Sequence, residues 1–297
     1  MAAGVVRVGI SGWRYAPWRG VFYPAGLRQR AELEFASRQL ASIEINGSFY
    51  SLQPPAAWQS WHAATPDDFL FAVKGPRFVT HMKKLRDVQG PIANFFASGV
   101  LALRAKLGPI LWQLPPNLGF EPERLESFLS LLPHDTRTAH ELALTHDERV
   151  VRSGVWLEPV PSRPLRHAIE VRHASFVDAR FVALLRRHRV ALVVADTAGC
   201  WPLLEDVTAD FVYVRLHGDE ELYASGYRDE ALAGWARRIH AWRSGAQAAD
   251  ARVASPAAPR KRARRDVYCY FDNDVKVHAP FDAARLARLV AAPGAGA

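Results

Sequence analysis

Polar and charged side chains recur at the ends of short apolar runs in this sequence. Side chains alternate across an extended strand, so residues two apart share a face. In these runs an apolar or small residue, such as Ala72 or Ala168, is followed on the same face by a polar one, such as Lys74 or Glu170. The polar residues placed at the run ends in this way are Glu44, Asn46, Lys74, Gln113, Glu170, Arg172, Asp196, Arg215 and His217. If the runs are strands whose ends meet, the sequence predicts one polar site.

The residue types of this set suit acid–base chemistry on an anionic or hydroxyl-rich molecule. Glu44 and Glu170 can serve as general base and general acid once their environments separate their pKa values, and the expected catalytic group adds Asp196 and His217. Lysine and arginine can hold an anion, and arginine adds bidentate geometry. The expected substrate-binding residues are Trp13, Asn46, Lys74, His81, Gln113, Arg172, Arg215 and Asn273. This set predicts an enzyme of hydrolase, lyase or isomerase type that acts on a phosphorylated or polyhydroxylated small substrate.

A divalent metal ion is a variant of the same site. Glu44, Glu170, Asp196 and His217 offer carboxylate and imidazole ligands of the kind that bind Mn²⁺, Mg²⁺ or Zn²⁺. Lysine and arginine side chains interleaved among them oppose a tight cage around a cation. The sequence therefore requires no cofactor, and whether a metal binds stays open.

Ion pairing is the structural alternative for any single residue of the set. An isolated buried ion is costly, so Glu170 with Arg215, or Glu44 with Lys74, could simply close the mouth of a barrel. Structural pairs need no particular end of a barrel, whereas the polar residues here all follow their apolar partners. That shared position favours a functional site.

Three of the expected residues belong to loops at the rim of the site. His81 lies seven residues beyond Lys74, Trp13 lies in an aromatic-rich first loop, and Asn273 follows the last apolar run. An exposed loop histidine and simple packing of the loop aromatics are the structural alternatives. At least one side chain of residues 272–274 is expected to point into the site.

Eight apolar, β-branched runs and the helical patterns between them must position these residues. The runs are Val6–Ile10, Ser42–Asn46, Phe69–Lys74, Pro109–Leu114, His167–Arg172, Ala191–Asp196, Phe211–His217 and Val267–Asp272. Helical patterns cover Leu27–Leu40, Ile92–Leu107, Pro122–Leu132, Phe176–Arg189, Asp229–Trp242 and Asp282–Val290. This alternation predicts an α/β protein, a TIM (β/α)₈ barrel with its site at the carboxyl ends of the strands. An open doubly wound sheet is the alternative, but the turn at residues 9–13 lacks the GxGxxG spacing usual there.

We predict a single barrel domain over residues 5–292 with two interruptions. Residues 133–165 form an insertion before the fifth strand. Residues 251–265 hold six of the 38 basic residues and no acidic one, in a Pro/Ala/Arg composition typical of a flexible, disordered loop. We call this segment the basic loop. As a connection from a helix to a strand, it should lie at the amino-terminal face of the barrel, away from the site.

The net charge of +8 comes mostly from the basic loop, because the rest of the chain carries 32 basic and 30 acidic residues. Such a loop could contact nucleic acid through electrostatics, so a nucleic-acid-binding or processing protein is one alternative to the enzyme. A non-catalytic binder of a small anionic or polar ligand is another. The two cysteines lack CxxC spacing, and neither a signal peptide nor a membrane-spanning run is evident. These features predict a cytoplasmic protein without membrane contact, and they leave the oligomeric state open.

A series of motifs follows the predicted strands in order. Among them are Gly9-Ile10-Ser11-Gly12-Trp13, Glu44-Ile45-Asn46, Lys74-Gly75-Pro76, Glu170-Val171-Arg172-His173 and Tyr213-Val214-Arg215-Leu216-His217-Gly218. Their order and spacing, over Val6 to Val290, resemble the YecE-like family, known as domain of unknown function 72. The resemblance implies a TIM barrel and no established activity. The family's last motif looks like Phe-Asn-Asn-Asp with a glycine soon after, whereas here Asp272 replaces the first Asn and Val277 stands at the glycine position.

Overall fold

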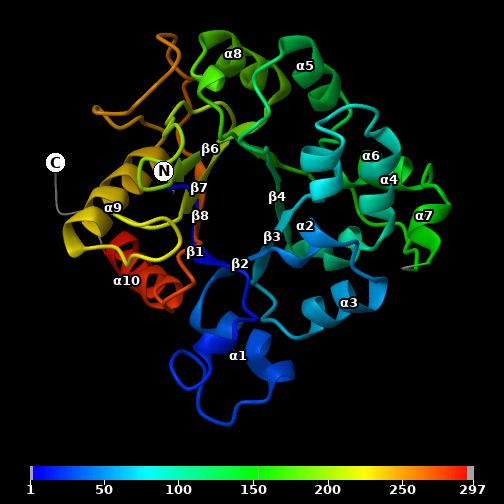
Figure 1. Ribbon diagram of the computed structural model, residues 1–297, viewed down its shortest axis with the longest axis horizontal. Coiled ribbons are helices and arrows are strands. Elements are labelled where there is room, and N and C mark those ends of the chain that lie inside the picture. Colours follow the sequence, from blue (N-terminus) through cyan, green and yellow to red (C-terminus); the bar gives the residue numbers. More distant parts are fainter. Residues whose placement is uncertain (1–2, 153, 293–297) are drawn as a thin grey trace.

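Eight parallel strands form a closed barrel in the computed structural model, which describes residues 3–152 and 154–292 (Figure 1). The strands are β1 (Val6–Ser11), β2 (Ser42–Ile45), β3 (Leu70–Lys74), β4 (Leu107–Gln113), β5 (His167–Glu170), β6 (Ala191–Asp196), β7 (Phe211–Leu216) and β8 (Asp266–Phe271). Each strand pairs with the next one, and β1 pairs with β8 so that Gly9 lies opposite Tyr270. This closure confirms the predicted (β/α)₈ barrel and excludes the open sheet.

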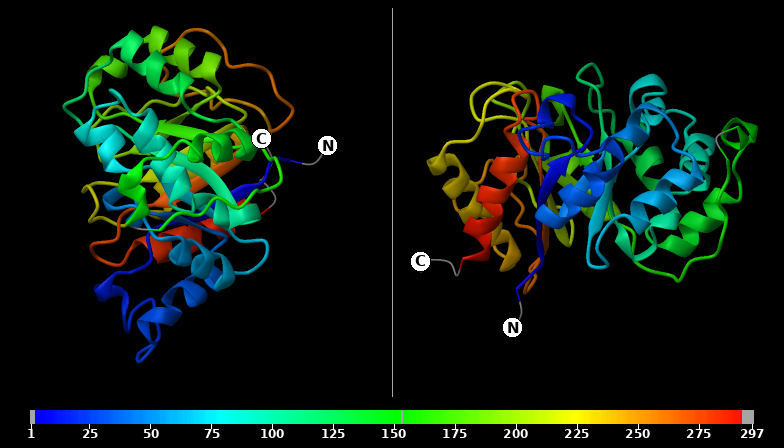
Figure 2. Two further views of the ribbon diagram at one scale, coloured as in Figure 1. Left: turned by 90° about the vertical axis from the view of Figure 1, so that its right-hand side faces the viewer. Right: turned by 90° about the horizontal axis from the view of Figure 1, so that it is seen from below.

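Helices surround the outside of the strands (Figures 1 and 2). They are α1 (Glu32–Gln39), α2 (Gly47–Tyr50), α3 (Pro55–Ala63), α4 (Gln89–Ala97), α5 (Pro122–Ser130), α6 (Thr136–Ala143), α7 (Glu148–Val151), α8 (Ala179–His188), α9 (Asp229–Arg243) and α10 (Ala279–Ala291). α8 is typical, because it buries Phe181 and Leu185 and begins at Asp178, whose side chain accepts a hydrogen bond from the Arg180 backbone N–H. No helix in the described ranges is long and apolar enough to cross a lipid bilayer.

The pattern over Ile92–Leu107 predicts one helix, but the chain forms two pieces there. α4 ends at Ala97, and a 3₁₀ segment covers Val100–Lys106. Gly99 lies between them with a φ of 111°, and a Cβ at this position would lie 2.8 Å from Cδ1 of Trp58. Close packing against α3 therefore requires a glycine in a left-handed conformation, and that conformation ends the helix.

The predicted insertion before β5 packs on the barrel through α4. It contains α6 and α7, which both contact α4. The Asn94 side chain of α4 donates a hydrogen bond to Asp147 Oδ1 at 2.9 Å. Asp147 also accepts a hydrogen bond from the Arg149 backbone N–H and so caps α7. The insertion is therefore part of the helical layer rather than a separate unit.

The basic loop connects α9 to β8 and contains no helix or strand. Arg265 at its end is only 1% exposed and donates a hydrogen bond to the Gly245 carbonyl oxygen at 2.5 Å. Near its other end, the Ser255 backbone N–H donates to Asp206 Oδ1 at 3.1 Å. These contacts anchor both ends of a segment whose composition predicts flexibility, and the flexibility itself stays a prediction.

Small side chains and tyrosines fill the interior of the barrel. One apolar cluster holds the inward-facing residues, which include Ala72, Leu111, Ala168, Val193, Ala195, Tyr213 and Tyr270. The residues between them in the chain, such as Val73, Ile169 and Val194, belong to the larger cluster beneath the helices. The next inward position on each strand lies at the carboxyl end, where the small side chains below leave room for long polar ones.

Candidate functional site

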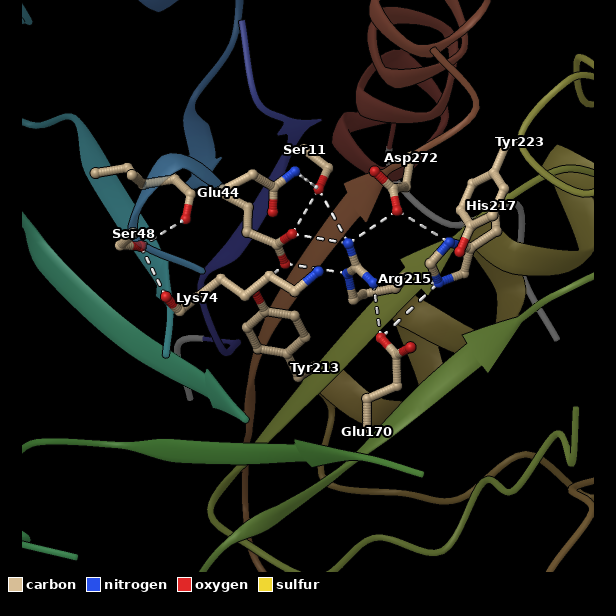
Figure 3. A network of polar contacts seen from close by, with 12 residues as sticks. Ser11, Glu44, Ser48, Lys74, Glu170, Tyr213, Arg215, His217, Tyr223 and Asp272 are labelled. Atoms are coloured by element: carbon tan, nitrogen blue, oxygen red, sulfur yellow. Dashed lines mark hydrogen bonds and ion pairs between the residues drawn. The ribbon is translucent and has the colours of Figure 1, made fainter. Parts of the chain in front are cut away.

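Arg215 lies at the centre of a polar cluster at the carboxyl end of the barrel (Figure 3). It stands on β7 and is fully buried. Its Nε and Nη2 groups donate hydrogen bonds to the two carboxylate oxygens of Glu44 at 3.1 and 2.9 Å. Its Nη1 group donates to Glu170 at 2.7 Å, and Nη2 also donates to Asp272 at 2.9 Å. One guanidinium thus links three carboxylates from β2, β5 and the end of β8.

The charges of this cluster stabilise one another. Burial opposes ionisation of Glu170 and of Asp272, yet Arg215 holds the pKa of both carboxyls well below their usual range. Burial would lower the pKa of Arg215, but Glu44 and the other two carboxylates raise it well above its ordinary value. Glu170, Asp272 and Arg215 are therefore ionised at neutral pH, and none of them is set to exchange a proton there.

Glu44 is held by hydrogen bonds on both of its oxygens. Oε1 accepts from Ser11 Oγ at 2.5 Å as well as from Arg215, and Oε2 accepts from the Tyr213 hydroxyl at 2.6 Å as well as from Arg215. A carboxylate has about four lone-pair positions, so these four donors satisfy it. Glu44 is fully buried and committed to the cluster.

Lys74 is a buried lysine that forms no ion pair with any described residue. It ends β3 with 8% of its surface exposed, and Figure 3 shows its side chain directed towards the cluster around Arg215. Its Nζ lies 4.3 Å from the centre of the Phe49 ring. Within the described residues, Nζ donates no hydrogen bond and has no carboxylate oxygen within 4.0 Å. Burial and then Arg215 lower the pKa of Lys74 to about 8, against the opposite pull of Glu44 and Asp272.

Arg172 lies at the edge of the cluster, just beyond β5. Its Nε donates to Glu170 Oε1 at 3.0 Å, and its Nη2 donates to the Tyr223 hydroxyl at 3.2 Å. The guanidinium carbon lies 3.9 Å from the centre of the Trp201 ring. The side chain is 10% exposed, whereas Glu170 beneath it is fully buried. Arg172 is therefore the arginine of the cluster that a ligand in the mouth can reach.

His217 joins the same cluster from the residue after β7. Its Nδ1 lies 3.1 Å from Asp272 Oδ2, in an orientation that does not form a good hydrogen bond. Its Nε2 lies 3.4 Å from Arg215 Nη1, which can only donate. The Tyr223 ring packs edge-on against the imidazole at 5.3 Å. His217 is fully buried, so it contributes to the packing of the cluster and not to its exposed edge.

Three more of the predicted residues lie around this cluster. Burial and the nearby Lys74 lower the pKa of His81 to about 4, so its half-buried ring is neutral at neutral pH. Asn46 donates from Nδ2 to Ser11 Oγ at 2.9 Å. Gln113 ends β4 beside Glu170 in the register of the strands. The buried oxygens Asn46 Oδ1 and Gln113 Oε1 accept no hydrogen bond from any described residue.

Two predicted site residues point away from the mouth. The inward residues of β6 are Val193 and Ala195, so Asp196 faces the helices, where it accepts a hydrogen bond from the Tyr227 hydroxyl at 3.1 Å. Asn273 has the outward parity of β8, and its Nδ2 donates to the Ser225 carbonyl and to Asp282, both at 2.9 Å. Asp196 was thus predicted on the wrong face of β6. At least one of residues 272–274 was expected to point into the site, and Asp272 does so whereas Asn273 does not.

Trp13 packs in the first loop rather than lining the cluster. Its ring is 6% exposed and lies edge-on to Trp61 at 5.4 Å. Its carbonyl oxygen accepts a hydrogen bond from the Tyr23 hydroxyl at 2.5 Å. Trp13 also lines, together with Asn46, a pocket of about 220 Å³, so its substrate-binding role stays a prediction.

The proposed set of four metal ligands does not come together. Asp196 faces the helices, and Arg215 stands between Glu44 and Glu170, where a cation would have to lie. No group of three or more His, Cys, Asp or Glu side chains in the described ranges could hold a metal ion. The carboxylates of the cluster are bound by the guanidinium of Arg215 instead.

Four residues of the cluster were not among the predicted site residues: Ser11, Tyr213, Tyr223 and Asp272. Asp272 shares the inward parity of Tyr270, and Ser11 shares that of Gly9, so strict alternation identifies both. Asp272 supplies a charge for Arg215 that the Asn expected from the resemblance would lack. Tyr223 comes from the long loop between β7 and α9, where no periodic pattern marks it.

The fold and the cluster define a (β/α)₈-barrel protein with an ionic network built into its carboxyl-terminal mouth. The sequence model of the family described as "Protein of unknown function DUF72" matches residues 7–296. The chain belongs to this family, which confirms the resemblance found in the sequence motifs. The family description assigns no activity.

Individual relatives agree with this membership. The chain is similar to the UPF0759 protein YecE of Escherichia coli (strain K12), at 28% identity over 130 residues; the alignment covers 43% of this chain and 45% of the relative. A DUF72 family protein from Thermotoga maritima has a similar structure, with a TM-score of 0.68, 22% identity and coverage of 97% of this chain and 99% of that one. A DUF72 family protein from Enterococcus faecalis V583 has a TM-score of 0.66, 15% identity and coverage of 97% and 96%. At these identities the structures support the fold alone.

Proposed function

We propose that this chain is an enzyme that acts on a small phosphorylated or polyhydroxylated substrate at the carboxyl-terminal mouth of the barrel, with Lys74 as the proton-transferring group. The observation that carries the proposal is the state of Lys74, which is buried at the end of β3 without an ion pair or a hydrogen bond in the described residues. Lysine is almost never fully buried unless it is paired. Nζ of Lys74 itself keeps some access to solvent, so a ligand in the mouth can reach it, and a titratable group with a shifted pKa in such a place is a functional-site candidate.

The Arg215 cluster supports this role by keeping the carboxylates away from Lys74. Glu44 and Glu170 are bound to Arg215, so they do not capture the amine as ion-pair partners. Arg215 also disfavours the charged amine through like-charge repulsion. With a pKa of about 8, Lys74 exchanges a proton near neutral pH, which is the range in which a general base is effective. The proposal therefore assigns proton transfer to Lys74 in place of Glu44 and Glu170.

Substrate binding is assigned to the exposed edge of the cluster. Arg172 has its Nε and Nη2 groups engaged, while its Nη1 group donates to no described residue and can receive an anionic or hydroxyl oxygen. Arg215, predicted as an anion-binding residue, is assigned a structural role because its donors are taken by carboxylates. The unsatisfied amide oxygens of Asn46 and Gln113 can accept hydroxyl protons of a polyhydroxylated substrate.

Proton abstraction by a neutral amine fits lyase or isomerase chemistry. The unprotonated Lys74 amine takes a proton from the substrate and becomes an ammonium, which Glu44, Asp272 and Glu170 stabilise through their charge. The same ammonium then returns the proton to the substrate or to the leaving group. This cycle uses the side chains of the chain alone.

A turnover screen of small phosphate esters and polyhydroxylated compounds tests the proposal. Three proteins are compared: wild type, Lys74→Met, and Lys276→Met, which changes an exposed rim lysine that pairs with Glu221. We expect Lys74→Met to lower kcat by about 100-fold or more, because general acid–base catalysis contributes about that much. Lys276→Met should leave kcat within about twofold of wild type. Saturable ligand binding without turnover in wild type would instead establish a non-catalytic binder.

A further inference from the structure

An arginine-lined cavity of about 270 Å³ lies at the amino-terminal end of the barrel, opposite the Arg215 cluster. Its walls include residues that directly precede β5, β6 and β7, together with part of the basic loop. The charged side chains that line it are Arg166, Arg186, Arg189, Arg260, Arg262 and Asp210. This cavity is separate from the proposed active site and takes no part in the function assigned there.

The cavity carries more positive charge than its carboxylates neutralise. Arg166 pairs with Asp210 at 3.2 Å and with Asp266 at 2.8 Å, which uses the single carboxylate of the lining. Arg186 donates hydrogen bonds to the carbonyl oxygens of Val207 and Ala257 at 3.3 and 3.0 Å. In the described part of the chain, four lining arginines have no carboxylate within 4.0 Å: Arg186, Arg189, Arg260 and Arg262. Burial and Arg189 also lower the pKa of His134 in the same lining, as expected beside concentrated positive charge.

The backbone of the basic loop makes defined contacts at Arg260 and Arg262. Arg265 Nη2 donates a hydrogen bond to the Arg260 carbonyl oxygen at 2.9 Å, and Arg265 itself is buried. The Arg262 carbonyl packs so closely on Gly245 that a Cβ there would lie 2.0 Å from the oxygen. In Figure 1 the orange segment lies at the periphery of the barrel near α8, and the Arg186 side chain of α8 donates a hydrogen bond to the Ala257 carbonyl oxygen at 3.0 Å. The cavity is therefore lined on one side by residues that precede β5, β6 and β7, and on the other side by the basic loop.

We propose that this cavity binds the phosphate group of a small phosphorylated ligand. Guanidinium groups offer paired N–H donors that match phosphate oxygens, and arginines from the C-terminal end of α8 and from the basic loop line this cavity. The volume of about 270 Å³ lies just below the range of about 300–1,000 Å³ for ligand pockets, so it suits a phosphate group with a small organic part. Binding at this face is non-catalytic, because the active sites of (β/α)₈ enzymes lie at the opposite end.

A phosphate titration with paired charge variants tests this proposal. Inorganic phosphate is added to the full-length chain, and backbone amide shifts are followed by TROSY NMR, which distinguishes the two ends of the barrel. The test variant is Arg260→Ala/Arg262→Ala, and the control is Lys261→Ala/Arg264→Ala, which removes equal charge from the same loop outside the cavity lining. Arg189→Ala, on the opposite wall, is an independent third variant. Thermal unfolding of each variant checks that the chain is folded.

We expect saturable shifts around residues 207–210 and 259–262 in wild type and in the control variant. The Kd should rise about tenfold or more in the test variant and in Arg189→Ala, and less than about twofold in the control. An equal rise in the Kd for phosphate in the test and control variants would show that phosphate responds to the overall charge of the loop and not to the cavity, and would overturn the proposal. A single-stranded oligonucleotide that binds these residues more tightly than phosphate, with equal sensitivity to both double variants, would assign the face to nucleic acid and would also overturn it. Neither outcome bears on turnover at Lys74.

Discussion

Replacing Lys74 with methionine is expected to make the folded protein more stable at neutral pH, although it removes the group to which we assign the chemistry. Methionine has a similar length, stays apolar and can pack against Phe49, so the exchange keeps the volume of the site. What it removes is a buried charge that has no ion pair in the described residues. Residues that serve catalysis often lower the free energy of unfolding of the folded protein.

The size of the gain follows from the pKa of Lys74. Burial and Arg215 lower it from 10.5 to about 8. One pKa unit corresponds to about 1.4 kcal/mol, so protonated Lys74 costs the folded state about 3 kcal/mol at pH 7. Loss of the cation–π contact with Phe49 offsets about 1 kcal/mol of this. A net gain of about 2 kcal/mol in the free energy of unfolding is expected for Lys74→Met.

The gain should depend on pH in a defined direction. Because the folded-state pKa of Lys74 lies below that of the unfolded chain, the unfolded chain binds the proton more tightly between pH 8 and pH 10.5. The free energy of unfolding of the wild type therefore rises with pH through that window relative to Lys74→Met. By pH 10 the electrostatic part of the difference should fall to about 1 kcal/mol.

Urea unfolding at pH 7 and pH 10 measures this difference, with Lys106→Met as the matched control. Lys106 is also a buried lysine, but its Nζ donates hydrogen bonds to the carbonyl oxygens of His62 and Thr65, both at 2.7 Å. Its replacement leaves buried carbonyls unsatisfied, at a cost of about 1–3 kcal/mol each, so it should destabilise the protein. A Lys74→Met protein that is less stable than wild type at pH 7, or a difference that does not change with pH, would refute the reasoning.

Three other changes test the polar cluster and the basic loop. Arg215→Met leaves buried carboxylates without their cation and should lower the free energy of unfolding by about 3–5 kcal/mol in urea at pH 7, with partial recovery at lower pH as the carboxyls take up protons. Asp272→Asn removes a charge that raises the pKa of Lys74, so the amine should react with acetic anhydride at lower pH than in wild type, as mass spectrometry of the labelled lysine would show. Arg265→Ala should lower the free energy of unfolding by about 1–3 kcal/mol, because it removes a buried side chain that donates hydrogen bonds to main-chain carbonyls. Replacement of the exposed Arg264 by alanine should change it by less than about 0.5 kcal/mol, and thermal unfolding of the two variants measures the difference.

Alternation along the strands predicts the cluster wherever the two faces of a strand differ in composition. Lys74 and Glu170 follow inward-facing alanines, so their faces can be read directly. The same rule fails on β6, where Leu192, Val193, Val194 and Ala195 are all apolar. A strand buried on both faces shows no alternation, so neither parity is favoured and Asp196 was assigned to the wrong face.

The pairing of charges within the cluster could not be predicted, because it depends on reach in three dimensions. In the sequence, both Lys74 and Arg215 are candidate ion-pair partners for the carboxylates of the cluster. The cation that does not pair with them is left to bind a ligand. Arginine presents five N–H donors in a planar fork, so Arg215 contacts all three carboxylates at once from the middle of the barrel mouth. A lysine ammonium has three donors at a single point and cannot span the same distance between strands. Once the arginine has bound the carboxylates, Lys74 is left without an ion-pair partner among the described residues, and burial and Arg215 lower its pKa to about 8.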